Sequence, residues 1–426
     1  MQKSFYLLGI GGVSMSALAV MLKEKGFQVS GFDERESRTT KLLQENGIFV
    51  DFETNFDAIN KADVVARSAA IKDDDPFVIY AKSQNKQIIS RGQLLAQIAE
   101  DFDCVVSVAG SHGKTTTTAM IFEILSVAGL KPSLHLGGFR KENGQNFVLD
   151  GNEYFVTEAC EYHDNFLCLH PDLSVITNVE KEHLDYFKTF ENQKKSFKKF
   201  KAQSRVVVEG VGDCCAKNIK HDKFGRVHFD LFENNKFVFN LRLQLFEDVN
   251  VENCLYAYRA AKKLGIPDCA IKIALEKFKG VERRFEKVSA KGFANVFVDY
   301  AHHPTEIKKA IETAKRLSKN KLLVTIFQPH TFSRTKLLLD EFVDVFVDVQ
   351  LPVFFKTYSA REKESEGISA KEFTKILQTK NKFAQYFENI DDLTDFFDVF
   401  NKKKVVLLFL GAGDLPDILH KNKFIS

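Results

Sequence analysis

Several features that would place a protein in a special class are missing from this sequence. Trp is absent, and the seven cysteines form an odd number without any C-x-x-C pair. Neither a disulfide framework nor a structural zinc site is therefore expected, and the cysteines fit the reducing cytoplasm. We attach no function to the absence of Trp or to the 41 Phe residues, which we interpret as core filler.

The sequence also lacks a strong excess of either charge and a long apolar run. Lys and Arg number 60 against 57 Asp and Glu, a balance that does not favour a nucleic-acid partner. Residues 5–22 carry no charge and superficially resemble a signal peptide. Gly9, Gly11 and Gly12 interrupt that stretch, so a strand, a tight turn and a helix explain it better. No other stretch approaches the ~20 apolar residues that cross a bilayer, so we expect no membrane insertion.

The chain is long enough for several domains. At about 150 residues per domain, its 426 residues predict two to four of them. Strand-like and helix-like segments alternate throughout, which is typical of parallel sheets with helices on their faces. The predicted fold class is therefore α/β with three domains, and we place their boundaries at 1–100, 101–281 and 282–426.

The expected elements follow from apolar runs, helical periodicity and glycine stops. Strands are predicted at 4–8, 27–32, 64–67, 87–90, 104–108, 154–157, 174–177, 295–299, 321–327, 353–356, 383–387 and 405–410. Helices are predicted at 14–25, 114–128, 189–201, 250–264, 304–317, 369–379 and 391–401. The stretch 210–245 has no clear pattern, so its elements cannot be ordered.

The strongest functional signal is a glycine-rich loop between a predicted strand and a predicted helix. Residues 109–118 read A-G-S-H-G-K-T-T-T-T. Backbone N–H groups of such a loop bind phosphate, while Lys114 would neutralise phosphate charge and Thr115 would ligate Mg²⁺. Val108 stands where the usual motif has its first Gly, and the alternative is a turn that only joins two elements. The loop predicts binding of a nucleoside triphosphate.

A second glycine pattern lies near the N-terminus. Residues 9–14 read G-I-G-G-V-S, and Asp33 follows the next strand. This is similar to a dinucleotide fingerprint with Ser14 in place of the third Gly, and it predicts binding of a diphosphate-bearing nucleotide. The alternative is a tight turn without a ligand. A dehydrogenase would also need a nicotinamide site, and no recognisable one follows.

Polar side chains at the ends of two central strands predict a metal site. Glu158 and Glu161 close the strand at 154–157, and His183 follows the strand at 174–177. In open α/β sheets such strand ends lie beside the ligand. Carboxylates with a neutral imidazole could hold a hard cation next to phosphate, although Mg²⁺ prefers oxygen ligands.

The third block places cations and imidazoles at strand ends. Arg283 and Arg284 open the block, the sequence D-Y-A-H-H-P-T-E ends the strand at 295–299, and Q-P-H-T-F-S-R-T ends the strand at 321–327. Arginine offers paired contacts to carboxylate and phosphate, so these segments suit anionic substrates. Surface ion pairs are the alternative for each arginine.

Taken together, these residues resemble the Mur ligases of peptidoglycan synthesis. The resemblance extends over essentially the whole chain. It rests on the loop at 110–118, Glu158 with His183, and the triplet R-F-E at 284–286. The segments G-I-G-G-V-S-M-S at 9–16, D-Y-A-H-H-P-T-E at 299–306 and Q-P-H at 328–330 are similar to the branch of the family that adds L-alanine.

The resemblance implies a fold and an activity. It implies a Rossmann-like N-terminal domain for the UDP-sugar, a central P-loop-type ATPase domain with a mostly parallel sheet, and a Rossmann-like C-terminal domain. The activity would be ATP-dependent ligation of L-alanine to the lactyl carboxylate of UDP-N-acetylmuramate through an acyl-phosphate, with Mg²⁺ as cofactor. The protein would be a cytoplasmic monomer or homodimer.

The resemblance also implies roles for individual residues. For the UDP-sugar it implies Gly9, Gly11, Gly12, Ser14, Asp33 and Ser68. For ATP it implies Gly110, Ser111, His112, Gly113, Lys114, Thr115, Thr116, Asn250, Asn253, Arg284 and Asp299. For the metal it implies Thr115 at a first Mg²⁺, and Glu158 with His183 at a second. For catalysis it implies Lys114, His183, His330 and Arg334; the base for the amine stays open between His183, His330 and water.

Three positions depart from the family pattern. Val249 replaces a histidine before the paired asparagines near adenine, Glu182 replaces an aspartate before the metal-binding histidine, and Thr331 replaces an arginine. Phe197 stands where related ligases carry a modified lysine, as expected for the alanine-adding branch. The alternatives left open are a ligase that attaches a tripeptide to the same sugar nucleotide, a P-loop kinase or NTPase, and a nucleotide-binding regulator.

Overall fold

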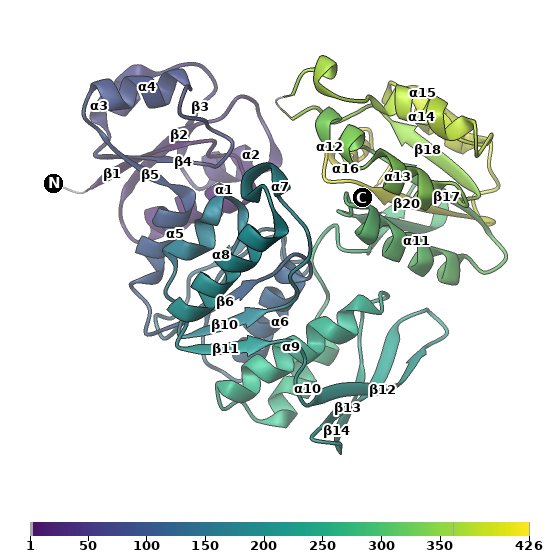
Figure 1. The fold of residues 1–426 in the computed structure, drawn as a ribbon, viewed down its shortest axis with the longest axis horizontal. Helices are drawn as coiled ribbons and strands as arrows, with labels where there is room; N and C mark the ends of the chain where they lie inside the picture. Colours follow the sequence, from purple (N-terminus) through teal and green to yellow (C-terminus); the bar gives the residue numbers. More distant parts are fainter. Residues whose placement is uncertain (1–2, 361, 426) are drawn as a thin grey trace. The chain divides into compact units, whose positions relative to one another are not determined.

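The computed structural model describes residues 3–360 and 362–425. The chain divides into two compact units. The first comprises Met1–Ile219, His228–Gln244 and Val249–Val281, and the second comprises Lys220–Val227, Leu245–Asp248 and Glu282–Ser426. Figure 1 shows strands and helices alternating along the chain in each of them, as the α/β prediction requires.

The N-terminal part of the first unit is a five-stranded parallel sheet of order β3-β2-β1-β4-β5. Its strands are β1 Ser4–Leu8, β2 Gln28–Phe32, β3 Phe49–Asp51, β4 Val64–Arg67 and β5 Gln87–Ser90. Its helices are α1 Val13–Glu24, α2 Arg38–Glu45, α3 Phe56–Lys61, α4 Pro76–Ser83 and α5 Arg91–Ala99. This strand order is that of a Rossmann-type sheet, in which ligands bind where the order reverses, beside the carboxyl end of β1.

The central part of the first unit is a six-stranded sheet of order β11-β10-β6-β9-β7-β8, parallel except for the β7–β8 pair. Its strands are β6 Cys104–Ala109, β7 Ser133–His135, β8 Phe147–Val148, β9 Tyr154–Glu158, β10 Leu173–Ile176 and β11 Val206–Glu209. Its helices are α6 Lys114–Val127, η1 Tyr162–Cys168, α7 Leu184–Phe187, α8 Phe190–Gln203, α9 Val249–Lys263 and α10 Asp268–Lys277.

The stretch that had no clear pattern in the sequence contains a small separate sheet. It consists of β12 Cys214–His221, β13 Val227–Glu233 and β14 Lys236–Arg242 in that order. A register shift between Leu231 and Phe232 interrupts the alternation of β13, so its period-two pattern is broken.

The second unit contains a six-stranded sheet of order β15-β16-β20-β17-β18-β19, with only β15 antiparallel to its neighbour. The strands are β15 Glu286–Ala290, β16 Phe293–Asp299, β17 Leu322–Phe327, β18 Leu351–Phe355, β19 Gln385–Phe387 and β20 Val405–Leu410. The helices are α11 Pro304–Ser318, α12 Phe332–Leu337, α13 Leu339–Phe346, η2 Glu364–Glu366, α14 Ala370–Gln378, α15 Ile390–Asp398 and α16 Leu415–Lys421.

Burial explains why the central strands of both units were the easiest to predict. All six residues of β20, V-V-L-L-F-L, are buried, as are the last five of β6. A strand covered on both faces by helices reads as a continuous apolar run. The phenylalanines fill these cores, as expected: the Phe327 ring lies 5.5 Å from that of Phe342 and 5.4 Å from that of Phe346.

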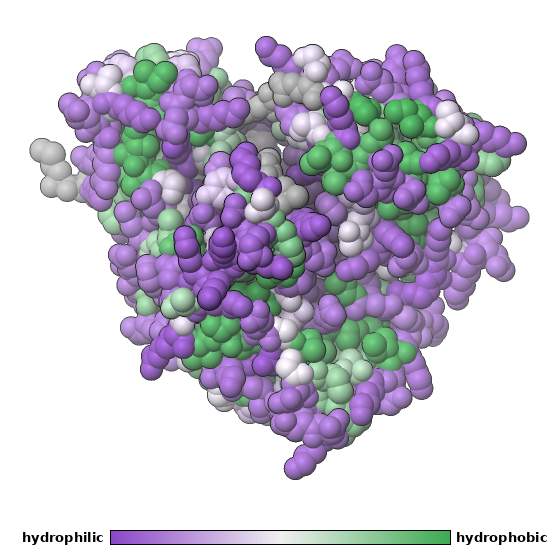
Figure 2. Space-filling view, in the orientation of Figure 1, coloured by the Kyte–Doolittle hydropathy of each residue, from purple (hydrophilic) through white to green (hydrophobic). Residues whose placement is uncertain are grey.

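The face of the molecule in Figure 2 is mostly hydrophilic, with apolar patches between the hydrophilic side chains. Among residues 3–360 and 362–425, no helix is both long enough and apolar enough to cross a bilayer. The uncharged stretch at 5–22 is divided between β1 and α1, as the sequence predicted.

Candidate functional site

The glycine-rich loop leaves β6 at Ala109 and enters α6 at Lys114. Gly110 and Gly113 have φ values of 134° and 81°, which residues with a side chain rarely adopt. Residues after β10 brace the loop: Ser111 donates its backbone N–H to the Asn178 carbonyl at 3.0 Å, and His112 donates its N–H to Asn178 Oδ1 at 2.8 Å. These two hydrogen bonds fix the loop at the carboxyl end of the central sheet.

Replacing Gly110 with alanine is expected to disable this loop. A Cβ there would lie 2.1 Å from Thr177 Oγ1 and would also strain the backbone. Gly129 is a matched control, because its φ is 80° but no atom lies within 4 Å of an added Cβ. Calorimetric titration with ATP should show at least a tenfold loss of affinity for Gly110→Ala, whereas Gly129→Ala should lose only about 1 kcal/mol of stability. Equal ATP affinity in the two variants would contradict a phosphate-binding loop.

Lys114 extends back over its own loop. Its ammonium donates to the Gly110 carbonyl, to the Ser111 carbonyl at 3.0 Å and to Glu161 Oε1 at 3.2 Å. Burial would lower the pKa of Lys114, but the carboxylates around it, Glu161 first among them, raise it above its ordinary value. The ammonium is therefore charged at every physiological pH, as neutralisation of phosphate requires.

Thr115 and Glu158 lie together at the start of α6. The Thr115 hydroxyl donates to Glu158 Oε2 at 3.0 Å, and the Gly137 N–H donates to Glu158 Oε1 at 2.6 Å. The same carboxylate is thereby fixed from two sides. Two of the residues predicted for the metal are thus in direct contact.

His183 has different neighbours from those that the sequence suggested. Glu161, Glu182 and His183 each place a ligand atom within 4.8 Å of the others, and His183 Nε2 lies 3.5 Å from Glu161 Oε1. Glu158 was predicted to share a cation with His183 but is not in this group. The position of Glu161 at the end of the predicted strand pointed to a metal site, but the roles implied by the family resemblance did not include it. Glu182 was noted only as a departure from the family pattern, since nothing in its spacing shows that it would turn toward His183.

The acidic group at 161–183 fits a hard cation. Glu161 is fully buried, and its Oε2 accepts no hydrogen bond, although Lys114 Nζ lies 3.2 Å away. Burial would raise the pKa of Glu161, but Lys114 and His183 hold it below its ordinary value. Burial raises the pKa of Glu182 despite the nearby Lys114. Carboxylate oxygens with spare capacity beside a phosphate loop are suitable Mg²⁺ ligands.

Asn250 and Asn253 lie against the other side of the loop. Both are buried on α9, and Asn253 Nδ2 donates to Asn250 Oδ1 at 3.1 Å. Thr117 Oγ1 donates to Asn253 Oδ1 at 3.4 Å, and a Cβ on Gly113 would lie 2.4 Å from the same oxygen. Asn253 therefore lies close to Gly113 of the glycine-rich loop, although 136 residues separate Thr117 from Asn253.

The N-terminal glycine pattern forms a second loop at the carboxyl end of β1. Gly9 donates its N–H to the Phe32 carbonyl at 2.8 Å, and Gly11 donates its N–H to Asp33 Oδ2 at 2.8 Å. Ser68 lies over the loop, since a Cβ on Gly9 would be 2.7 Å from its Oγ. The structure thus brings the predicted Gly9, Gly11, Asp33 and Ser68 together, with Asp33 bonded to the loop itself.

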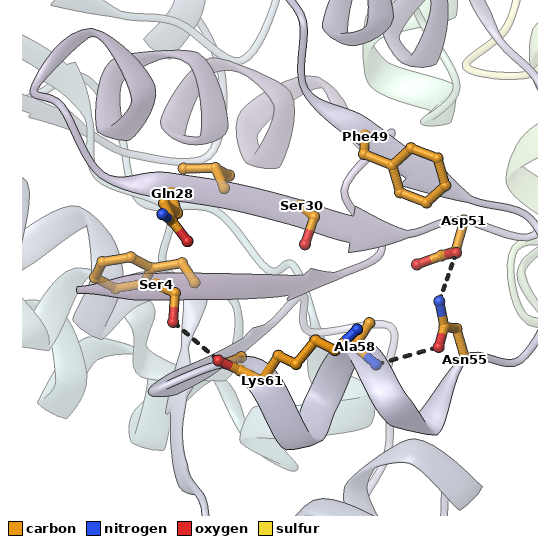
Figure 3. A pocket seen from close by; sticks show the side chains of 11 residues that line it. Ser4, Gln28, Ser30, Phe49, Asp51, Asn55, Ala58 and Lys61 are labelled. Carbon is orange, nitrogen blue, oxygen red and sulfur yellow. Dashed lines mark hydrogen bonds between the residues drawn. The ribbon is translucent and has the colours of Figure 1, made fainter. Parts of the chain in front are cut away.

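The pocket in Figure 3 lies away from the loop at 9–12. It has a volume of about 420 Å³ and is lined by β1, β2, β3 and α3, including Ser4 and Gln28 at the amino ends of their strands. Its carboxylate, Asp51, already accepts from Tyr6 Oη at 2.9 Å and from Asn55 Nδ2 at 3.0 Å. Ligands of open α/β sheets bind at the carboxyl ends of the strands, so we assign no ligand to this pocket.

The second unit carries its own polar cluster at the end of β16. Asp299 is buried and accepts the Phe285 N–H at 2.6 Å and the Ala301 N–H at 2.7 Å. Burial raises the pKa of Asp299, and Arg284 opposes that rise. Arg283 donates to the carbonyls of Gly411 and Gly413 at 2.7 and 2.8 Å, so it ties two loops together.

His330 and Arg334 lie at the end of β17 in the same unit. Arg334 Nη1 is 3.4 Å from His330 Nδ1. Burial and Arg334 lower the pKa of His330 to about 4, so the ring is neutral at pH 7. Because arginine only donates, Nδ1 is the acceptor and the ring proton is on Nε2.

The chain is similar to known proteins along nearly its whole length. Three family models match consecutive parts of the chain: "Mur ligase family, catalytic domain" at 4–103, "Mur ligase middle domain" at 108–211 and "Mur ligase, glutamate ligase domain" at 283–413. A UDP-N-acetylmuramate–L-alanine ligase of Caldicellulosiruptor bescii is 39% identical, with 97% of each chain covered. The chain belongs to the Mur ligase family.

Other Mur ligases agree in sequence and in fold. A UDP-N-acetylmuramate–L-alanine ligase of Caldicellulosiruptor saccharolyticus is 36% identical, with 96% of each chain covered. The crystal structure of UDP-N-acetylmuramate–alanine ligase from Thermotoga maritima has a TM-score of 0.84 and 26% identity, and the match covers 98% of this chain and 97% of that one. The predicted α/β fold with three domains is thereby confirmed.

Two positions that depart from the usual Mur ligase pattern are placed by the structure. Val249 is half-buried and is the first residue of α9, immediately before Asn250. Thr331 precedes α12 with φ 68°, and its N–H donates to the Tyr358 carbonyl at 2.9 Å. Val249 therefore directly precedes the asparagine pair, and Thr331 has a positive φ that β-branched residues rarely adopt, three residues before Arg334.

Proposed function

We propose that this protein joins L-alanine to the lactyl carboxylate of UDP-N-acetylmuramate, with ATP converted to ADP and phosphate, in peptidoglycan precursor synthesis. The observation that carries the proposal is the loop at 110–118, with Lys114 and Thr115 beside the carboxylates of Glu158 and Glu161. Mur ligases are ATP-dependent, and two relatives at 36–39% identity over nearly the full length are named UDP-N-acetylmuramate–L-alanine ligases. The free cysteines fit the cytoplasm, where we place the reaction.

The domain boundaries at 1–100, 101–281 and 282–426 are part of the proposal. The first domain would bind the UDP-sugar through the loop at 9–12 with Ser14, Asp33 and Ser68. The central domain would bind ATP through residues 110–116, Asn250 and Asn253. The third would contribute Arg284 to phosphate and Asp299 to ribose.

Mg²⁺, held by Thr115, Glu158 and the group at 161–183, would supply charge neutralisation on the transferred phosphoryl group. Lys114 acts at the same phosphate, so it assists attack of the sugar-borne carboxylate on the γ-phosphorus, which releases ADP. The resulting acyl-phosphate is a good acyl donor. The amine of L-alanine then attacks the acyl carbon, and phosphate leaves.

His330 and Arg334 would bind the carboxylate of L-alanine. Arg334 carries a fixed positive charge, and the Nε2 proton of His330 provides a second donor. With a pKa of about 4, His330 is a weak base, and His183 belongs to the group proposed to hold the cation, which favours water for deprotonation of the amine.

An ADP-release assay tests this function directly. With UDP-N-acetylmuramate present, L-alanine should stimulate ADP formation, and omission of either substrate should abolish it. Calorimetric titration should show ATP binding that depends on Mg²⁺. ADP formation without an acceptor would indicate a simple NTPase, a preference for the tripeptide over L-alanine would indicate the recycling ligase, and tight nucleotide binding without turnover would indicate a regulator.

A further inference from the structure

A buried histidine connects the two loops of the first unit. His135 ends β7 and is 1% exposed. Its Nε2 lies 2.9 Å from Ser14 Oγ, and its Nδ1 lies 2.9 Å from Thr157 Oγ1. Arg91 Nη1 donates to Ser14 Oγ at 3.1 Å, and Thr157 Oγ1 lies 3.2 Å from the Glu158 carbonyl. Five residues from four separate segments thus form one continuous chain of hydrogen bonds.

The chemistry of the five groups determines which one donates and which one accepts in each hydrogen bond of this chain. Burial, followed by the charge of Arg91, lowers the pKa of His135 to about 3, so the ring is neutral and has one N–H. Arg91 only donates, and the Glu158 carbonyl only accepts. Every group is satisfied when Arg91 donates to Ser14, Ser14 to Nε2, Nδ1–H to Thr157, and Thr157 to the carbonyl.

The two partners of His135 in this hydrogen-bond chain lie beside different proposed sites. Ser14 is on the first turn of α1, directly after the loop at 9–12. Thr157 immediately precedes Glu158, whose carboxylate holds Thr115. A second contact lies alongside, since Asn146 Nδ2 donates to the Val13 carbonyl at 2.6 Å. The start of α1 is therefore attached to the central sheet at β7 and at the residue before β8, and the hydrogen bond from His135 to Thr157 continues to β9, directly before Glu158.

We propose that His135 is a positioning residue that couples binding of the sugar nucleotide to the metal-binding carboxylate of the ATP site. It fixes the start of α1 relative to β9. A displacement of the loop at 9–12 therefore changes the position of Glu158, and a displacement of Glu158 changes the position of that loop. The proposal rests on the proposed function, because it takes the loop at 9–12 as the sugar-nucleotide site.

The first test needs no substrate. In ¹⁵N NMR spectra of the full-length protein, the His135 ring should be neutral at pH 7 with its proton on Nδ1. A proton on Nε2, or a charged ring, would overturn the proposal. Since this readout is independent of turnover, it is not affected if the proposed reaction is wrong.

The second test separates coupling from simple structural support. Thr157→Val removes the hydroxyl on the central sheet and should raise KM for UDP-N-acetylmuramate by about fivefold, within the range of one neutral hydrogen bond. Ser133→Ala is the matched control: it is buried at the other end of β7 and donates to the Gly151 carbonyl at 2.8 Å. It should lower thermal stability but leave that KM unchanged.

A mutant cycle completes the test. Ser14 and Thr157 both bond to His135, so the effects of Ser14→Ala and Thr157→Val on KM should be non-additive in the native background. In a His135→Leu background the same two effects should be additive. Additivity in both backgrounds, or a Thr157→Val enzyme with unchanged KM for the sugar nucleotide, would overturn the proposal.

Discussion

Replacement of Lys114 with alanine is expected to lower kcat for ligation by about 10³-fold, at the upper end of what loss of one preorganised electrostatic group costs. In the proposed function Lys114 is the cation of the phosphate-binding loop, and its ammonium is within hydrogen-bonding distance of Glu161 and of two loop carbonyls. Without it, charge on the transferred phosphoryl group is no longer neutralised at this point. Steady-state ADP release with saturating substrates measures the effect.

The same substitution is also expected to destabilise the fold. Glu161 is fully buried, so removal of its partner leaves an uncompensated carboxylate at a cost of about 3–5 kcal/mol. The double variant Lys114→Ala/Glu161→Gln should regain most of that stability in urea unfolding but none of the activity. A Lys114→Ala enzyme with more than a tenth of native kcat would exclude Lys114 from phosphoryl transfer.

The local motifs were predictable because each consists of residues that are adjacent in the sequence. The segment at 109–118 predicts a strand end, a glycine-rich loop and a helix start, and β6 and α6 on either side of the loop confirm them. The positive φ values of Gly110 and Gly113 are a finding of the structure. The buried strands β17 and β20 were found for a similar reason, since a continuous apolar run needs no tertiary information.

The remaining features depend on contacts between distant segments. Glu182 was noted only as a departure from a family pattern, yet the fold brings its carboxylate beside Glu161 and His183. His135 gave no signal, because a single histidine at the end of a three-residue strand has no periodicity or spacing to mark it. Its partners Ser14 and Thr157 are 121 and 22 residues away in sequence. Such networks are a property of tertiary packing, which a pattern in one sequence does not encode.

Replacement of Glu158 with glutamine tests the metal site with the least change in shape. In the structure the Glu158 carboxylate is fixed by Thr115 Oγ1 and the Gly137 N–H. A glutamine oxygen could still accept one of these bonds, but it lacks the negative charge that a hard cation prefers. The variant is expected to need at least tenfold more Mg²⁺ for half-maximal activity and to lose about 10²-fold in kcat.

A Mg²⁺ titration of ADP release distinguishes this loss from general damage. Glu142→Gln is the control, since Glu142 belongs to the same unit but pairs with Arg140 on the surface at 2.8 Å. It should retain the native Mg²⁺ dependence. If Glu158→Gln does so as well, Glu158 serves only to orient Thr115, and the cation is then held by the group in which Glu161 supplies a buried oxygen without a hydrogen-bond donor.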